Sequence, residues 1–302
     1  MKKRVITGAA IAAVLVPAVY FGGIFFLIVG MFLSVVASYE MMSMFYKRGP
    51  ALRKLRFLVP ILSGIMVLFA YFAAMDVVNN MIYHFWVITS FIASIVICLA
   101  VLIFTRQSTA HDMMACIMTL VYCGLIMGYV ISIEYITPIG TSEYLDNIIK
   151  GGRSFAYLIA IVVATDTLAY FIGSKYGKHK LAPEISPKKS VEGAVAGLIG
   201  GAIIGVVCTF LFQMVKFTPS TTTIHKIIII FVIFVFSLIL SASVQVGDLV
   251  ASKLKRSYEI KDFGKIFPGH GGVLDRFDSL IFAGAVYYVI VQFIQLVLLG
   301  VE

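Results

Sequence analysis

Long apolar runs separated by short polar segments dominate the sequence. A helix needs about 20 apolar residues to cross the hydrocarbon core of a bilayer. Nine runs approach or exceed this length, at residues 5–20, 23–46, 57–75, 84–104, 113–136, 154–173, 191–215, 226–249 and 279–299. The pattern predicts an all-α, polytopic integral membrane protein with about nine transmembrane helices.

Composition excludes an ordinary soluble domain. Hydrophobic residues make up 61% of the 302 residues and charged residues 13%, and the mean hydropathy is +1.01. Soluble domains carry roughly 25% charged residues. The N-terminal run follows Lys2-Lys3-Arg4 and resembles a signal peptide, but a second apolar run begins almost at once. We therefore expect a retained first helix rather than a cleaved leader.

The basic residues are distributed unevenly between alternate loops. With a cytoplasmic N-terminus and nine crossings, only four of the 24 Lys and Arg residues lie on the outer side, namely Lys150, Arg153, Lys216 and Lys226. This bias matches the positive-inside rule. We expect residues 1–150 to form transmembrane helices one to five. Residues 151–302 are expected to form helices six to nine with cytoplasmic loops 174–190 and 250–278. These two loops are long, basic and rich in Gly, Pro, His and acidic residues, so chemistry is expected in this part of the chain.

Small residues mark one helix as a packing surface. Gly193, Gly197, Gly201 and Gly205 recur at four-residue spacing and form a smooth ridge on a helix. Such ridges let two helix backbones approach closely within a membrane. We assign this ridge no chemistry.

A polar stripe runs along the eighth predicted helix. Ser241, Gln245, Asp248 and Ser252 are spaced four, three and four residues apart, which places them on one face. Asp275 and Asp278 are three residues apart where the ninth helix starts, and they share a face if the helix begins there. With Asp248 they make an all-oxygen set that suits Mg²⁺. The alternative for Asp275 and Asp278 is that they only complement the positive helix N-terminus.

Basic side chains accompany these acids. Lys255, Arg256, Lys261 and Arg276 lie in the same segment, and Lys188 and Lys189 lie in the other cytoplasmic loop. A metal ion together with Lys and Arg is how proteins hold a triphosphate. The alternative is that they only fix topology.

Two further polar residues have two interpretations each. Asp166 lies within the sixth apolar run, where a carboxylate is either functional or hydrogen-bonded to a neighbouring helix. His270 lies in the run Pro268-Gly269-His270-Gly271-Gly272 and is either a phosphate donor or a turn residue. Spacing does not decide between these readings.

The segment from Ser252 to Asp278 resembles the signature of the phosphatidate cytidylyltransferases. It reads S-x-hydrophobic-K-R, four residues, K-D (Lys261-Asp262), then P-x-H-G-G-hydrophobic-x-D-R-hydrophobic-D. Residues 166–173 and 178–193 are similar to a second stretch of that family. The resemblance covers roughly residues 154–299, and nothing is carried onto the first five helices.

The resemblance implies that CTP and phosphatidic acid give CDP-diacylglycerol and pyrophosphate. It implies a multi-pass enzyme of the cell inner (plasma) membrane with its active site facing the cytoplasm, Mg²⁺ as cofactor with a second cation left open, and membrane lipid as surroundings. No nucleic-acid partner is expected, and a homodimer is left open. The implied metal ligands are Asp248, Asp275 and Asp278. The other catalytic candidates are Lys261, Asp262, His270 and Arg276, and the substrate-binding candidates are Lys188, Lys189, Ser252, Lys255, Arg256 and Asp166.

Rival functions differ in measurable ways. A CTP-dependent lipid or polyprenol kinase would release CDP instead of pyrophosphate. A CDP-alcohol phosphotransferase would need the D-G-x-x-A-R pattern, which the sequence lacks. A transporter would use Asp166 and Asp248 for ion coupling and would be expected to show internal repeats.

Overall fold

The observed secondary structure is almost entirely helical. A computed structural model describes residues 2–75, 80–135, 151–215, 217, 222–267 and 271–299. In this part of the chain, eight helices are long and apolar enough to span a membrane, and the first helix has a shorter apolar part, Gly8–Phe21. The all-α polytopic class is confirmed, and the number of spanning helices is close to the predicted nine.

The chain divides into two compact units. The first comprises Met1–Tyr135 and Ser257–Phe277, and the second comprises Ile136–Arg256 and Asp278–Glu302. The segment that joins the last two helices therefore belongs to the same unit as the N-terminal helices. We call it the connecting segment, residues 258–273.

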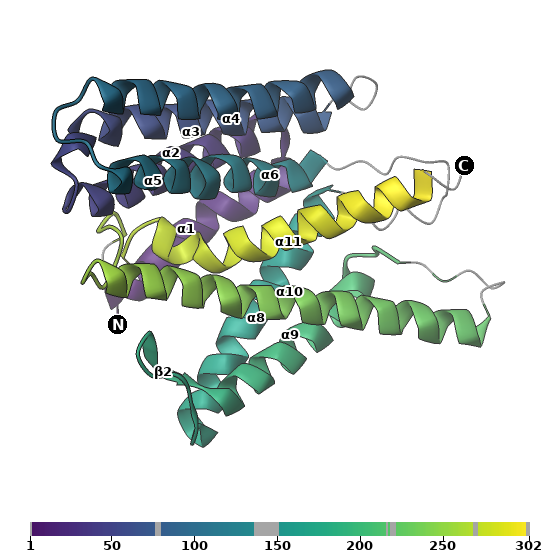
Figure 1. Cartoon of the computed structure of the whole chain (residues 1–302). Helices are drawn as coiled ribbons and strands as arrows, with labels where there is room; N and C mark the ends of the chain where they lie inside the picture. The colour runs from purple at the N-terminus through teal and green to yellow at the C-terminus, as the bar shows by residue number, and fades with distance from the viewer. Residues whose placement is uncertain are drawn as a thin grey trace. The chain divides into compact units, whose positions relative to one another are not determined.

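The first unit is a group of packed helices. In Figure 1, α3 and α4 run side by side, and α5 and α6 continue one another through a π-helical turn, η2. Two short 3₁₀ helices, η1 and η3, complete the unit. The bounds are α1 Lys2–Phe21, α2 Gly23–Tyr46, η1 Pro50–Arg53, α3 Leu55–Met75, α4 Asn80–Ile103, α5 Ala110–Thr119, η2 Leu120–Ile126, α6 Met127–Ser132 and η3 Ile133–Tyr135.

The second unit combines long helices with a small hairpin. Its elements are α8 Gly151–Tyr176, β1 Lys180–Ala182, β2 Ser186–Ser190, α9 Val191–Leu211, α10 Thr223–Ser257 and most of α11 Leu274–Leu299. The strands pair antiparallel, with Lys180 opposite Ser190. The Ser190 hydroxyl accepts the N–H of Gly193 at 3.2 Å and caps α9. Half of the predicted loop 174–190 is therefore an ordered hairpin that leads directly into a helix.

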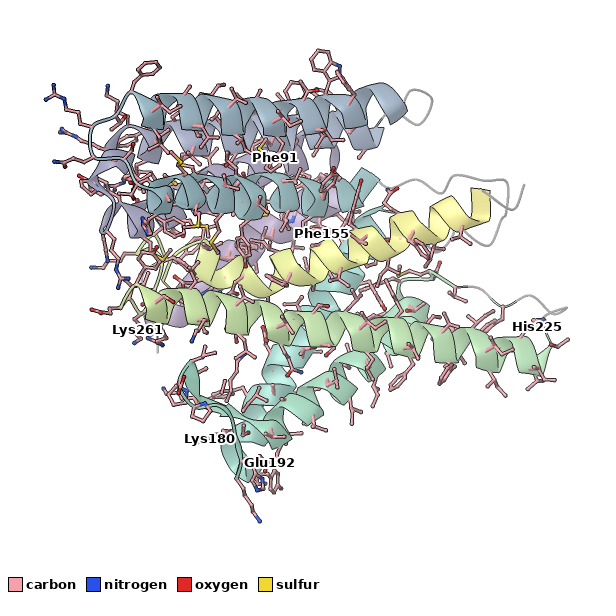
Figure 2. All side chains as sticks on the ribbon, in the orientation of Figure 1. Phe91, Phe155, Lys180, Glu192, His225 and Lys261 are labelled. Atoms are coloured by element: carbon pink, nitrogen blue, oxygen red, sulfur yellow. The ribbon has the colours of Figure 1, made fainter. Side chains whose placement is uncertain are left out.

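A second contact fixes the hairpin to α9. Glu192, in the first turn of α9, accepts the backbone N–H of Lys178 at 3.0 Å, and its Oε1 lies 2.6 Å from Nδ1 of His179. Figure 2 labels Glu192 and Lys180 at this end of the unit. A carboxylate in the first turn also complements the helix dipole. These contacts set the direction in which β2 runs.

The glycine ridge on α9 packs against α8, as predicted. A Cβ added at Gly197 would lie 2.7 Å from the carbonyl oxygen of Thr165, and one added at Gly193 would lie 2.6 Å from that of Ala169. Real Cβ atoms do not approach so closely, so any larger residue would push the helices apart. The close contact holds Asp166 of α8 in register with the start of α9.

Both helices that flank the connecting segment differ in extent from the apolar runs. α10 continues to Ser257, eight residues beyond the predicted run, and α11 begins at Leu274 rather than at residue 279. Hydropathy marks only the apolar part of a helix, whereas Leu, Lys and Arg also favour helical structure where the chain becomes polar. Ser252, Lys255 and Arg256 are consequently helical residues.

Candidate active site

The polar stripe of α10 faces other elements of the second unit. The Ser241 hydroxyl donates to the carbonyl of Gly197 at 3.1 Å and lies 2.7 Å from the hydroxyl of Thr165. One turn further, the Gln245 amide donates to the carbonyl of Ala194 at 2.9 Å. These bonds tie α10 to α8 and α9, and the next stripe residue, Asp248, contacts the strand β2 that precedes α9.

Asp248 forms an ion pair with Lys189. The Nζ of Lys189, on β2, lies 2.5 Å from Oδ2 of Asp248, and the Ser252 hydroxyl lies 3.4 Å from Oδ1. Successive side chains of a strand point to opposite faces. Lys188 is accordingly exposed, while Lys189 turns inward. The structure therefore brings together a residue from each of the two segments that the sequence singled out.

Asp278 is a buried acid near this pair. Its side chain is 6% exposed, and its Oδ1 accepts the backbone N–H of Ser279 at 2.8 Å. It interacts electrostatically with Asp248, Asp166 and Lys255. Three carboxylates from α8, α10 and α11 thus lie within electrostatic range of one another, balanced in part by two lysines.

These acids do not form a complete metal cage by themselves. Within the described residues, no three His, Cys, Asp or Glu side chains are close enough together to hold a metal ion. Mg²⁺ is usually bound by one or two carboxylates together with substrate phosphates and water. The donors present, the carboxylates of Asp248 and Asp278 and the hydroxyl of Ser252, are the hard oxygen ligands that such an ion requires.

Arg256 and Asp166 are placed at the exposed edge of the same unit. The Arg256 guanidinium donates to the carbonyl of Ile185 at 3.4 Å, which ties the end of α10 to the hairpin. Asp166 is exposed on α8 and interacts electrostatically with Asp278, and both interpretations of its carboxylate stay open.

Asp275 has a different environment in the first unit. It is 8% exposed, and its Oδ2 accepts the backbone N–H groups of Phe263 at 2.8 Å and Gly272 at 2.9 Å. The carboxylate closes the connecting segment into a loop at the start of α11. Asp275 therefore has a structural role at the N-terminus of α11, similar to the alternative considered for it from the sequence. Its role as a metal ligand stays a prediction.

Three further predicted residues lie in the connecting segment or in the first turn of α11. Lys261, Asp262 and Arg276 are exposed, and Figure 2 labels Lys261 in the segment that follows α10. An anionic ligand would be attracted by Lys261 and Arg276 and repelled by Asp262. His270 lies outside the described residues.

Glu40 is a residue of this region that the site prediction missed. It lies on α2 and is 3% exposed, and it accepts the backbone N–H of Val273 at 3.1 Å through Oε1 and that of Leu274 at 3.0 Å through Oε2. A carboxylate inside a spanning helix is a functional candidate by default. The rule that selected Asp166 would have selected Glu40 as well.

The other end of the connecting segment is held by an aromatic cluster. The Tyr258 hydroxyl lies 2.6 Å from Nε2 of His111, the Arg48 guanidinium lies 4.9 Å above its ring, and Phe45 contacts the ring edge-on. Burial raises the pKa of the Tyr258 phenol above its usual value, because it penalises the charged form. A neutral phenol anchors the segment as it leaves α10.

Comparison with known proteins identifies the family. Residues 2–294 match the cytidylyltransferase family. The chain is 32% identical over 292 residues to a protein of Bacillus subtilis named phosphatidate cytidylyltransferase, with 93% of this chain and 94% of the relative covered. A protein of Staphylococcus saprophyticus with the same name is 33% identical over 287 residues, covering 93% and 95%. This chain belongs to the cytidylyltransferase family along nearly its whole length.

Proposed function

We propose that this protein is a phosphatidate cytidylyltransferase that makes CDP-diacylglycerol and pyrophosphate from CTP and phosphatidic acid. The observation that carries the proposal is the Lys189–Asp248 pair beside buried Asp278, in a chain similar over its length to enzymes of that name. Acids and lysines that come from several helices of a membrane protein are suited to bringing two phosphate-bearing substrates together.

The reaction needs little acid–base chemistry from the protein. A phosphate monoester has a second pKa of about 6, so the lipid phosphate is largely ionised near neutral pH. One of its oxygens attacks the α-phosphorus of CTP in line. The new P–O bond forms as the bond from the α-phosphorus to the bridging oxygen breaks, and pyrophosphate leaves with that electron pair.

The main obstacle to the reaction is electrostatic repulsion between CTP and the lipid phosphate, and the basic residues reduce it. Lys255 and Lys189 neutralise charge near Asp278, and we assign Lys188, Arg256, Lys261 and Arg276 to the triphosphate. Before CTP binds, Lys189 is held by Asp248. When CTP binds, the ammonium group exchanges part of this contact for a phosphate oxygen.

A divalent cation fits the donors that the chain presents. We assign Mg²⁺ to the carboxylates of Asp248 and Asp278, with Asp275 three residues earlier on α11, and leave a second cation open. When bound, such an ion would supply positive charge to offset that of the triphosphate and of the leaving pyrophosphate. Ser252, whose hydroxyl lies 3.4 Å from Asp248, and Asp166 are assigned to substrate binding beside these acids.

The position in the membrane follows from the charges and the substrates. The excess of Lys and Arg in alternate loops supports a cytoplasmic active site in the inner membrane, where CTP is available. The lipid keeps its tails in the bilayer and presents its phosphate at the interface. The molar mass of the purified protein in detergent tests whether it forms a homodimer.

One experiment tests the reaction directly. The purified protein is incubated with phosphatidic acid, Mg²⁺ and CTP labelled in the cytosine ring, and the lipid phase is extracted. We expect label in the lipid and one pyrophosphate released for each lipid labelled. Release of CDP without labelled lipid would indicate a kinase, and nucleotide-independent ion uptake in liposomes would indicate a transporter; either result would overturn the proposal.

A further inference from the structure

A carboxylate from the N-terminal half of the chain caps the helix that carries the candidate catalytic acids. Val273 immediately precedes α11 and Leu274 is its first residue, and their N–H groups point at the two oxygens of Glu40. The first N–H groups of a helix have no partner within the helix. Glu40 supplies that partner from 233 residues earlier in the chain.

Two glycines of the connecting segment lie directly against the Glu40 carboxylate. A Cβ added at Gly264 or at Gly272 would collide with an oxygen of Glu40. Neither glycine has the positive φ that would itself call for glycine, since among the described glycines only Gly22, Gly23 and Gly271 do. The absence of a side chain at Gly264 and Gly272 is therefore explained by the space that Glu40 takes.

Asp275 completes the arrangement from the other side. It binds the N–H groups of Phe263 and Gly272, and it interacts electrostatically with Glu40. Two carboxylates close together would repel each other unless each were neutralised, and here four backbone N–H groups do so. The start of α11 is thus held by several directional bonds.

We propose that Glu40 is a positioning residue for cytidylyl transfer, which fixes the first turn of α11 so that Asp275, Arg276 and Asp278 meet the phosphates at the correct angle. The inference rests on the proposed function. A helix is stiff, so the direction of its first turn sets where side chains three and four residues later point. A helix cap alone needs only a local Ser, Thr, Asp or Asn. A buried acid on a distant helix additionally fixes where the capped helix begins.

The test uses the full-length protein and matched variants. Glu40→Gln keeps the size of the side chain but leaves one N–H facing an amide group, and Gly264→Ala disturbs the same contact from the opposite side. Glu134→Gln is the control for a partly buried carboxylate of the same unit. Gly8→Ala is the control for a glycine, because an added Cβ there would lie more than 4 Å from other described atoms.

Two measurements separate positioning from general stability. Hydrogen exchange followed by mass spectrometry reports the N–H groups of residues 263–274 without any turnover. We expect faster exchange there in Glu40→Gln and Gly264→Ala, and no change in either control. For Glu40→Gln and Gly264→Ala, steady-state kinetics should give a kcat per folded molecule about 10- to 100-fold lower than that of the unmodified protein. A small misplacement of catalytic groups produces an effect of this size. The Mg²⁺ concentration for half-maximal rate should rise as well, which a mere loss of folded protein would not cause.

The outcomes distinguish the two proposals. If the unmodified protein makes no CDP-diacylglycerol, the proposed function fails, whatever the exchange data say. If it does, and Glu40→Gln exchanges faster but retains its kcat and Mg²⁺ requirement, Glu40 is only structural and the inference is overturned. Unchanged exchange overturns it too. Should Glu40→Gln not fold, Gly264→Ala decides by the same two measurements.

Discussion

The ammonium group of Lys189 lies 2.5 Å from the carboxylate of Asp248. Lys189 lies on β2 and Asp248 on α10. The family resemblance implies substrate binding for Lys189 and metal binding for Asp248. Their contact means that the binding of an anion and the binding of a cation at this place are linked. A phosphate that attracts Lys189 leaves Asp248 freer to bind a cation, and a cation on Asp248 releases Lys189 toward phosphate.

Replacing Lys189 with alanine should therefore impair the use of CTP. The variant loses a cation for the triphosphate and leaves Asp248 without its counter-charge. We expect kcat/KM for CTP to fall about 10- to 100-fold, somewhat less than the loss of a buried catalytic donor. Lys180→Ala is the matched control, because Lys180 is an exposed lysine of the same hairpin. Equal effects of the two changes would mean that the hairpin contributes only general positive charge.

The two acids of α11 should respond differently to amidation. Asp278→Asn and Asp275→Asn should each lower turnover by at least about 100-fold, since each removes a charge from the proposed cation site. Only Asp275 also closes the connecting segment, through Phe263 and Gly272. Weakening one such bond costs about 1–3 kcal/mol, so Asp275→Asn should additionally lower the melting temperature in detergent. Near-normal turnover in both variants would remove the metal assignment.

Removal of divalent cations should abolish the reaction. After EDTA treatment and gel filtration, we expect no labelled lipid, and added Mg²⁺ should restore the rate. Because Ca²⁺ is larger and prefers longer, more flexible coordination, it should restore less. The control is a melting curve before and after chelation, which shows whether the protein stays folded. A full rate in the chelated sample would refute a divalent cofactor.

The packing of α8 on α9 should tolerate no added methyl group. At Gly197, a Cβ would lie 2.7 Å from the carbonyl oxygen of Thr165. Overpacking of this kind costs about 1–3 kcal/mol. We expect Gly197→Ala to lower the melting temperature and also the rate, because Asp166 follows Thr165 on α8. Gly8→Ala should change neither, and an equally stable Gly197→Ala would show that α8 moves aside without strain.

Much of this arrangement could be predicted from local patterns. Apolar run length marks spanning helices, and the spacing of Ser241, Gln245 and Asp248 places them on one face whatever lies opposite. The glycine ridge likewise predicts close packing without naming its partner. These features depend on helical periodicity, which operates over a few residues and can be recognised in one sequence.

Contacts that join distant segments could not be predicted in this way. The pairing of Lys189 with Asp248 depends on the register of a short hairpin and on its attachment to α9 through Glu192. The partners of Glu40 are backbone N–H groups, which every residue except proline possesses. No side-chain pattern around Val273 or Leu274 therefore identifies them.

A last prediction concerns the pH dependence of stability. Glu134 lies after the last residue of a spanning segment, and burial raises the pKa of its carboxyl group to about 8. Within the described residues, its Oε2 takes part in no hydrogen bond, in keeping with a carboxyl that is protonated when folded. The folded protein then keeps this proton up to about pH 8, whereas the unfolded chain releases it near the ordinary value of 4.5.

Between these two values the folded state binds more protons, so stability should fall as the pH rises. We expect the melting temperature of the unmodified protein to decrease relative to Glu134→Gln between about pH 5 and pH 8 and to run parallel to it outside that window. Melting curves of both proteins in the same detergent across this range measure the difference. A constant offset at every pH would show that Glu134 has the same pKa in the folded and unfolded chain.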